Sequence, residues 1–148
     1  MDNPVNPPIL RGMEKDADLL IVGGGLNGPS LALAAARDGL SSVVIDALPQ
    51  AVMQAGDFDG RSYALAMSSV RLLRNLGVWP KIADHAQPML EIKVTDGRAG
   101  EGPLSPFHLH FDHGEIEEGP MGHMVEDRYL RIALLQAVDD NQIGRAHV

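Results

Sequence analysis

The sequence has no cysteine, few aromatic residues and no long hydrophobic run. The lack of cysteine excludes disulfides, thiolate metal ligands and a nucleophilic thiol. No apolar stretch approaches the roughly 20 residues of a membrane-spanning helix, and the N-terminal M-D-N-P-V-N-P-P lacks the basic and then apolar order of a secretory signal. We therefore expect an intracellular, soluble protein of the cytoplasm.

Positive charge is also scarce, since 12 Lys and Arg residues stand against 20 Asp and Glu residues and give a net charge of -8. Nucleic-acid binding requires clustered basic side chains that neutralise phosphates, so we expect no nucleic-acid partner. What is present suits one domain, because 148 residues with 45% hydrophobic content can bury a core of ordinary size.

The first predicted elements form a parallel unit. Residues 1–16 are rich in proline and lack apolar periodicity, so we expect a flexible N-terminal arm. Residues 19–22 are an apolar run that ends in glycines, the pattern of a strand buried on both faces of a parallel sheet. Small residues at helical spacing predict a helix over 26–38, and the β-branched run 42–46 predicts the next strand of a right-handed βαβ unit.

The remaining sequence changes character. Residues 47–60 lack periodicity and predict a long loop, and a helix is predicted over 68–76. Short segments between Gly, Pro and charged turns then predict an antiparallel meander with strands at 89–95, 107–112 and 122–125. A last amphipathic helix is predicted from Asp127, its expected N-cap. The predicted fold class is α/β, with a Rossmann-like βαβ unit and an attached antiparallel β meander.

The turn after the first predicted strand, G-G-G-L-N-G, fits the pattern G-x-G-x-x-G that binds dinucleotide phosphates. Gly23 permits the tight turn, Gly25 lets a pyrophosphate approach the backbone, and Gly28 permits close packing of the helix. The helix N-terminus offers N–H groups and partial positive charge to the phosphates. Asp46 lies eighteen residues after Gly28 at the end of the second strand, where a carboxylate accepts hydrogen bonds from ribose hydroxyls. Because this carboxylate would repel a 2′-phosphate, FAD or NAD fits better than NADP.

The segment D-G-R-S-Y-A-L-A at 59–66, together with the glycine turn and S-V-V-I-D-A, resembles the N-terminal part of the flavin-dependent aromatic monooxygenases, most of all their ubiquinone-biosynthesis hydroxylases. The later G-H-M-V-E-D-R-Y-L-R-I-A-L-L is similar to a strand and helix of that family, which commonly has V-E-N where this chain has V-E-D. The resemblance implies that the cofactor is FAD and that Arg61 lies near its pyrophosphate. Charge complementarity between guanidinium and phosphate supports the same role.

The resemblance also implies the activity of the whole enzyme. In this family NAD(P)H reduces FAD, and an OH group is transferred to an aromatic ring, here implied to be a prenylated phenol of ubiquinone synthesis. Such work implies peripheral association with the inner membrane or a biosynthetic complex. The resemblance covers about 17–139, and two later flavin-binding motifs of the family do not occur. We therefore expect 17–142 to be the N-terminal part of an FAD-binding domain, truncated and with weak or no flavin retention, and we assign no catalytic residue.

The last six residues, I-G-R-A-H-V, have no relation to the preceding predicted helix and match the translation of one reading frame of a common sequencing adapter. We therefore expect 143–148 to be a non-native tail.

Other functions stay open on the residues alone. One is a non-catalytic module that binds an adenine dinucleotide, and another is an NAD-dependent dehydrogenase, although no Tyr-Lys or His-based hydride-transfer pattern occurs. A metal site is suggested by His108, His110 and His113, with Asp112 and Glu115 nearby. On a strand, however, His113 would point away from the other two histidines, so we expect no metal.

Overall fold

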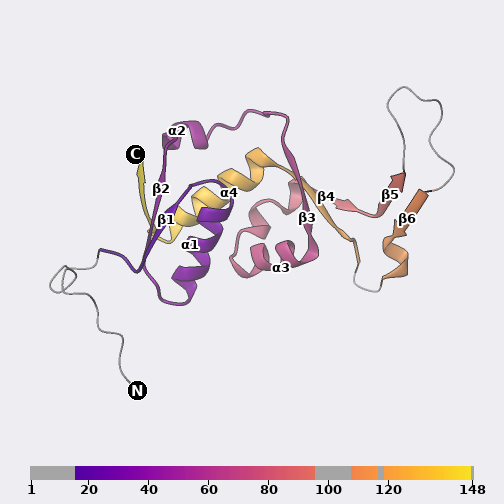
Figure 1. Ribbon diagram of the computed structural model, residues 1–148, viewed down its shortest axis with the longest axis horizontal. Helices are drawn as coiled ribbons and strands as arrows, with labels where there is room; N and C mark the ends of the chain where they lie inside the picture. The colour runs from indigo at the N-terminus through magenta and orange to yellow at the C-terminus, as the bar shows by residue number, and fades with distance from the viewer. Residues whose placement is uncertain (1–15, 96–107, 117–118, 148) are drawn as a thin grey trace, which may run out of the picture.

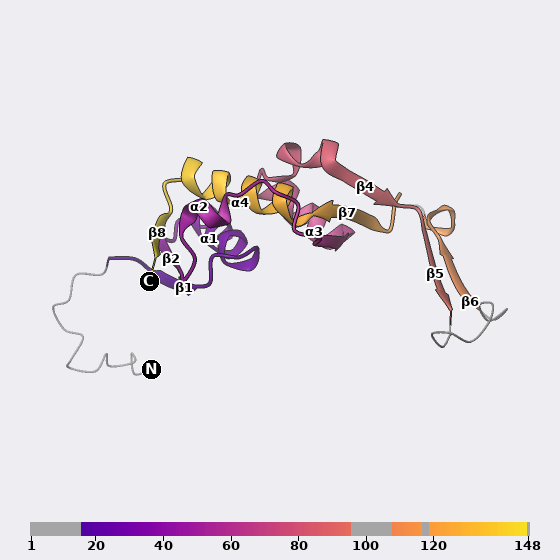
Figure 2. The ribbon, with the colours of Figure 1, turned by 90° about the horizontal axis from the view of Figure 1, so that it is seen from above.

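The computed structural model describes residues 16–95, 108–116 and 119–147, so the expected arm over 1–16 lies outside the described residues apart from Asp16. In chain order, with η for a 3-10 helix, the elements are β1 (Leu19–Val22), α1 (Asn27–Arg37), β2 (Ser42–Asp46), α2 (Gln50–Met53), β3 (Ser62–Ala66), α3 (Met67–Asn75), η2 (Trp79–Lys81), η3 (Ala83–His85), β4 (Ala86–Met89), β5 (Glu91–Thr95), β6 (His108–Asp112), η4 (His113–Glu115), β7 (Gly122–Glu126), α4 (Asp127–Asp140) and β8 (Gly144–His147). The molecule is elongated, with β8 at one end and β5 and β6 at the other (Figures 1 and 2).

The predicted βαβ unit is present, and its strands are parallel. The sheet has the order β1-β2-β8, and Ile21 lies opposite Val44 in the register. Both side chains are buried and pack against Ala32 of α1. The prediction that the first strand is buried on both faces is wrong, because Leu20 is 67% exposed and Val22 is 80% exposed. Apolar burial follows the face that a helix covers, and no other element among the described residues covers the opposite face of β1.

The predicted antiparallel part divides into two sheets. One has the order β3-β7-β4, and β5 pairs with β6 in a separate two-stranded sheet that projects from the body (Figure 2). The strand predicted over 89–95 corresponds to β5, and only Met89 belongs to β4, whose other residues were not predicted as a strand. The sequence reasoning also missed β3, because its five residues follow directly on the turn-rich segment 47–60.

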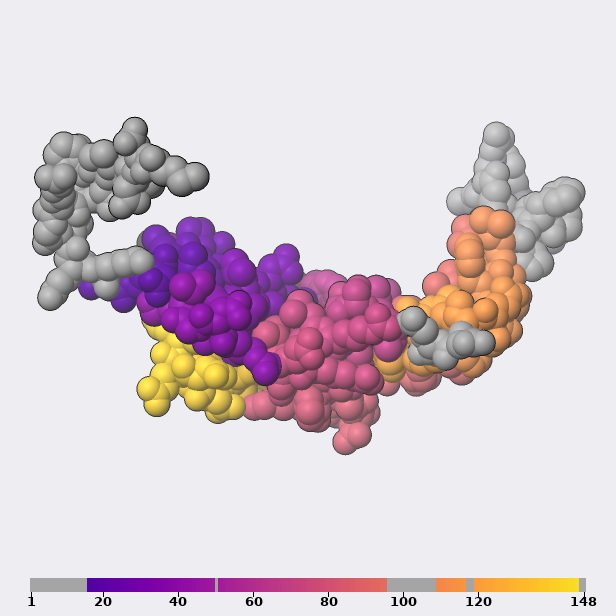
Figure 3. Space-filling view, turned by 90° about the horizontal axis from the view of Figure 1, so that it is seen from below, coloured from indigo at the N-terminus to yellow at the C-terminus, as the bar shows by residue number. Residues whose placement is uncertain are grey.

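The core forms around α4, which follows β7 directly and packs against α1 and β7. The predicted apolar spacing of this helix is confirmed, since its buried side chains include Leu130, Ala133, Leu134, Ala137 and Val138. Val70 and Leu73 of α3 meet them in the same cluster. Figure 3 shows the residues at the C-terminal end of the chain, in yellow, packed against the N-terminal unit in indigo. The helix thus joins the parallel sheet to the antiparallel sheet.

Strand β8 runs parallel to β2, with Gly144 opposite Val43. This pairing concerns the conformation of residues 144–147 and not their origin, so the expectation of a non-native tail stays a prediction. Among the described residues, no helix has the length and apolar composition required to cross a bilayer.

Candidate functional site

The glycine turn joins β1 to α1 in a geometry that requires two of its glycines. Gly23 has a φ of +107°, in the region that side-chain-bearing residues rarely adopt. A Cβ on Gly28 would lie only 1.9 Å from the Gly23 carbonyl oxygen, so no side chain fits between turn and helix. Gly25 differs, because a Cβ there would meet nothing within 4 Å. Gly23 and Gly28 therefore shape the turn, while Gly25 presents backbone to open space.

The N-terminus of α1 lies at this opening. Leu26 occupies the N-cap position and makes no side-chain cap hydrogen bond. The first N–H groups of a helix have no acceptor within the helix, and they carry the positive end of the helix dipole. An anion placed beside Gly25 would therefore receive hydrogen bonds from the backbone and a favourable field.

Asp46 at the end of β2 is tied to the glycine turn. Its Oδ2 accepts a hydrogen bond from Gly24 N at 2.5 Å, and its Oδ1 accepts one from Leu48 N at 2.7 Å. A carboxylate oxygen has two lone pairs and can accept more than one hydrogen bond. Sequence reasoning missed Gly24, where a Cβ would lie 3.0 Å from Met53 Cε and 3.1 Å from Asp46 Cβ. The run of three consecutive glycines, with Gly24 in the middle, was the available signal.

Arg61 lies just before β3 and is held by two carboxylates. Its Nε and Nη2 donate to Asp59 Oδ2 at 2.8 Å and 2.5 Å, and Nη2 lies 3.4 Å from Asp127 Oδ2. The hydrogen bond from Arg61 lowers the pKa of the Asp59 carboxyl, and the bond to Asp59 together with the charge of Asp127 raises the pKa of Arg61. The Arg61 side chain is 59% exposed, so it stays accessible to a ligand.

A pocket of about 390 Å³ brings three of the five predicted residues together. It is lined by Gly25, Asp46 and Arg61, of which the first and the last lie 36 positions apart in the sequence. Its other walls come from Leu26, Leu48, Val52, Met53, Ala55, Asp57, Asp59, Tyr63, Asp127 and Arg131. Gly23 and Gly28 are outside this lining and act through the shape of the turn. The pocket therefore places a helix N-terminus, a carboxylate and a guanidinium around one opening.

Asp127 has a role that the sequence did not predict. It was expected to be the N-cap of α4, but the cap position is Glu126, which makes no side-chain cap hydrogen bond. The Asp127 carboxylate instead is buried, with Oδ2 accepting from Arg131 Nε at 2.8 Å and Oδ1 accepting from Tyr63 Oη at 3.3 Å. The i,i+4 spacing of Asp127 and Arg131 was a sequence signal for that pair.

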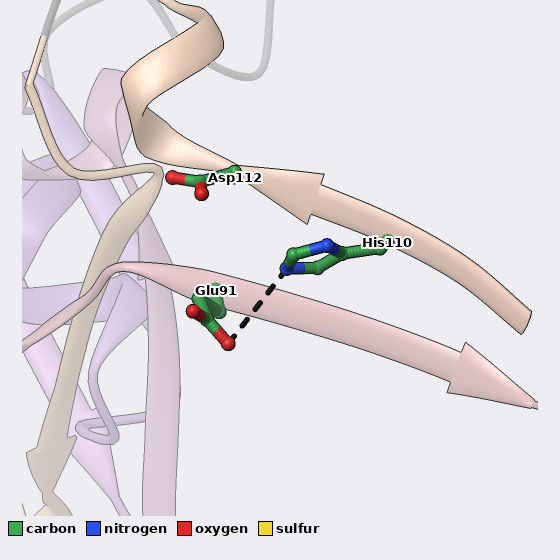
Figure 4. Close-up of side chains that lie close together, drawn as sticks. All are labelled: Glu91, His110 and Asp112. Atoms are coloured by element: carbon green, nitrogen blue, oxygen red, sulfur yellow. Dashed lines mark ion pairs between the residues drawn. The ribbon is translucent and has the colours of Figure 1, made fainter.

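The candidate metal ligands that lie close together in the structure are not the three histidines of the sequence pattern. Glu91, His110 and Asp112 offer ligand atoms within 4.8 Å of one another on β5 and β6, and Figure 4 shows His110 reaching towards Glu91. Lys93 Nζ, however, lies 2.6 Å from Glu91 Oε2. His113 belongs to η4, where its Nδ1 lies 3.1 Å from Leu90 O. A solvated ion-pair network explains this face, and the absence of a metal site stays a prediction.

Comparison with known proteins finds similarity over the part of the chain that contains this pocket. The family described as "FAD binding domain" matches residues 16–135. Ubiquinone hydroxylase UbiL of Rhodospirillum rubrum is 46% identical over 129 residues, which cover 86% of this chain and 28% of that protein. Ubiquinone hydroxylase UbiM of Neisseria meningitidis is 31% identical, with 85% of this chain and 27% of that protein covered. The chain thus spans less than a third of the length of these relatives.

Solved structures show the same fold at low sequence identity. The flavin-dependent monooxygenase PieE, in complex with FAD and substrate, matches with a TM-score of 0.59 and 20% identity, over 88% of this chain and 23% of that one. Aklavinone-11 hydroxylase, in a ternary complex with FAD and aklavinone, matches with a TM-score of 0.64 and 19% identity, over 91% of this chain and 26% of that one.

Proposed function

This chain belongs to the FAD-binding domain family, and from that premise we propose that it is the N-terminal part of an FAD-dependent monooxygenase that hydroxylates an aromatic ring. The observation that carries the proposal is the pocket in which Gly25, Asp46 and Arg61 converge at the N-terminus of α1. A helix N-terminus and a guanidinium suit a pyrophosphate, and a carboxylate beside them suits a ribose. The residues present therefore fit the ADP half of FAD.

Each residue would act on a different part of that half. The backbone at Gly25 would approach the pyrophosphate, because the position leaves open space where a side chain would otherwise stand. Asp46 would accept hydrogen bonds from the ribose while its bond to Gly24 holds the turn in place. Arg61 would neutralise phosphate charge from the opposite wall. FAD itself supplies the oxygen-activating redox chemistry when it is bound and has been reduced by NAD(P)H.

The substrate class that we propose is a polyprenylated phenol of ubiquinone biosynthesis. This proposal is supported by the sequence identity of 46% and 31% with two relatives that are named ubiquinone hydroxylases. An apolar prenyl chain would be presented at a membrane surface, so peripheral association with the inner membrane or a biosynthetic complex belongs to the same proposal. Residues 17–142 would be the part of the FAD-binding domain that holds the adenine nucleotide, with the ring-binding part supplied by further sequence.

Nucleotide titration of the purified chain tests the cofactor assignment. We expect ADP and FAD to compete for one site with weak affinity, measured by calorimetry and by quenching of flavin fluorescence. Adenosine 2′,5′-bisphosphate should bind at least about tenfold more weakly than AMP, which differs from it only in lacking the 2′-phosphate that would meet the Asp46 carboxylate. If neither ADP nor FAD binds at millimolar concentration, or if the 2′-phosphate has no effect, the assignment of this pocket is wrong.

A further inference from the structure

Asp127 is a buried carboxylate that serves no capping role, so its burial requires another explanation. Its side chain is 3% exposed, and an ionised carboxylate is costly to bury unless charged or hydrogen-bonded partners surround it. Arg131 and Tyr63 donate to it, and Arg61 Nη2 lies 3.4 Å away. The backbone is also tied, because Asp127 N donates to Arg61 O at 3.0 Å. The first turn of α4 is thus fastened to the start of β3.

Arg131 extends this network to the segment that follows α2. While its Nε contacts Asp127, its Nη1 donates to Met53 O and its Nη2 donates to Ala55 O at 3.2 Å. Its side chain is only 13% exposed, so few waters compete for these bonds. Arg128, one turn earlier, lies 3.4 Å from Gly56 O through Nη1. Two arginines of α4 therefore hold residues 53–56 through their backbone carbonyl groups.

We propose that Asp127 is a positioning residue of the nucleotide pocket, which through Arg131 and Arg61 holds the connection between β2 and β3 against α4. This inference rests on the proposed function, and it assigns no contact between Asp127 and the cofactor. Met53, Ala55 and Arg61 all line the pocket, together with Asp127 and Arg131 themselves. Without the carboxylate, Arg131 has no charged partner at 2.8 Å to orient it. The wall that carries Arg61 then loses its side-chain contacts with α4 and keeps only the backbone bond from Asp127 N to Arg61 O.

The two carboxylates beside Arg61 therefore differ in role. Asp59 is 40% exposed and can turn into solvent when a phosphate takes its place on the guanidinium. Asp127 is 3% exposed and cannot leave without breaking its bonds to Arg131 and Tyr63. Asp59 would consequently compete with the phosphate for Arg61, whereas Asp127 would keep its contacts when a phosphate binds. This asymmetry supplies a matched pair of variants with the same chemical change.

The experiment compares Asp127→Asn with Asp59→Asn by hydrogen exchange and by ADP titration. In Asp127→Asn we expect amide exchange over 53–61 to accelerate about tenfold or more, with exchange in α1 unchanged, and ADP affinity to fall about tenfold. In Asp59→Asn we expect wild-type exchange over 53–58 and an ADP affinity equal to or a few-fold above that of wild type. The Arg61 amide is left out of this comparison, because it donates to Asp59 Oδ1 at 3.1 Å. Uniformly faster exchange in Asp127→Asn would indicate a global structural role and overturn the proposal.

A second variant covers the outcome in which Asp127→Asn does not fold. Arg131→Lys keeps a positive charge for Asp127 but cannot reach both Met53 O and Ala55 O, so it should accelerate exchange over 53–61 alone. If the wild-type chain binds no ADP, the proposed function fails, but the exchange measurement still tests the attachment of the 53–61 segment. If the chain binds ADP and both variants leave exchange over 53–61 unchanged, the inference about Asp127 is wrong while the proposed function stands.

Discussion

Both ends of the molecule carry strands with apolar side chains, but only at one end does a helix bury an apolar face. At the end with β1, α1 and β2, apolar side chains face a helix and polar groups from distant segments converge on one pocket. At the end with β5 and β6, polar side chains form a ladder on one face, while Ile92, Val94, Leu109 and Phe111 on the other are exposed. Apolar side chains on a strand therefore do not make a core by themselves, because a further element must pack against them.

The largest expected difference between the two ends concerns leucines. Leu134 of α4 is 1% exposed, whereas Leu109 of β6 is 63% exposed. Leu134→Ala should lower the free energy of unfolding by about 2–5 kcal/mol, because it removes buried methyl groups and leaves a cavity. Leu109→Ala should change it by less than about 0.5 kcal/mol. Urea denaturation measures both, and similar costs for the two leucines would show that the apolar face of the β5–β6 pair is buried in solution.

The next effect separates two glycines of the turn. Gly28→Ala forces a Cβ against the Gly23 carbonyl oxygen, and we expect a loss of about 1–3 kcal/mol in the free energy of unfolding. Gly25→Ala meets nothing within 4 Å and should leave stability unchanged while weakening ADP binding. Thermal unfolding and ADP titration of both variants test this division. If both variants lower the free energy of unfolding equally, the division into a structural role for Gly28 and a binding role for Gly25 is wrong.

The sequence predicted contacts between residues that are close along the chain, but not contacts between residues that are far apart along it. The contact between Gly28 and Gly23 spans one turn, so the motif predicted it, and the apolar spacing of α4 predicted its buried face. The link from Asp127 to Arg61 joins residues 66 apart, which no local pattern reports, and the same carboxylate was therefore interpreted as a helix cap. The exposed face of β1 was mispredicted because an apolar run does not state which elements cover it.

A smaller effect is expected for the ribose carboxylate. Asp46→Asn removes the negative charge, so the dissociation constant for ADP should rise about tenfold while the penalty for a 2′-phosphate diminishes. Asn retains one oxygen acceptor, and circular dichroism should confirm that the turn with Gly24 still forms. Glu91→Gln on β5 removes the same charge at the other end of the molecule and serves as the control. If both variants weaken ADP binding equally, the effect is one of net charge rather than of the site.

The smallest expected effect comes from His123 of β7, and its sign follows from burial. Its ring lies 5.0 Å from that of Trp79 in an edge-to-face arrangement, and its Nδ1 is buried without a hydrogen-bond partner in the described structure. Desolvation, with a contribution from the charge of Arg74, lowers the pKa of His123 below its ordinary 6.5. The unfolded chain therefore binds a proton at a higher pH than the folded chain does, so the free energy of unfolding decreases as pH falls through about 6.5.

His123→Gln should flatten the dependence of the free energy of unfolding on pH, measured by urea denaturation between about pH 5 and pH 8, the range of histidine titration. His110→Gln on the exposed strand β6 is the comparison, and an equal flattening by that variant would contradict burial as the cause.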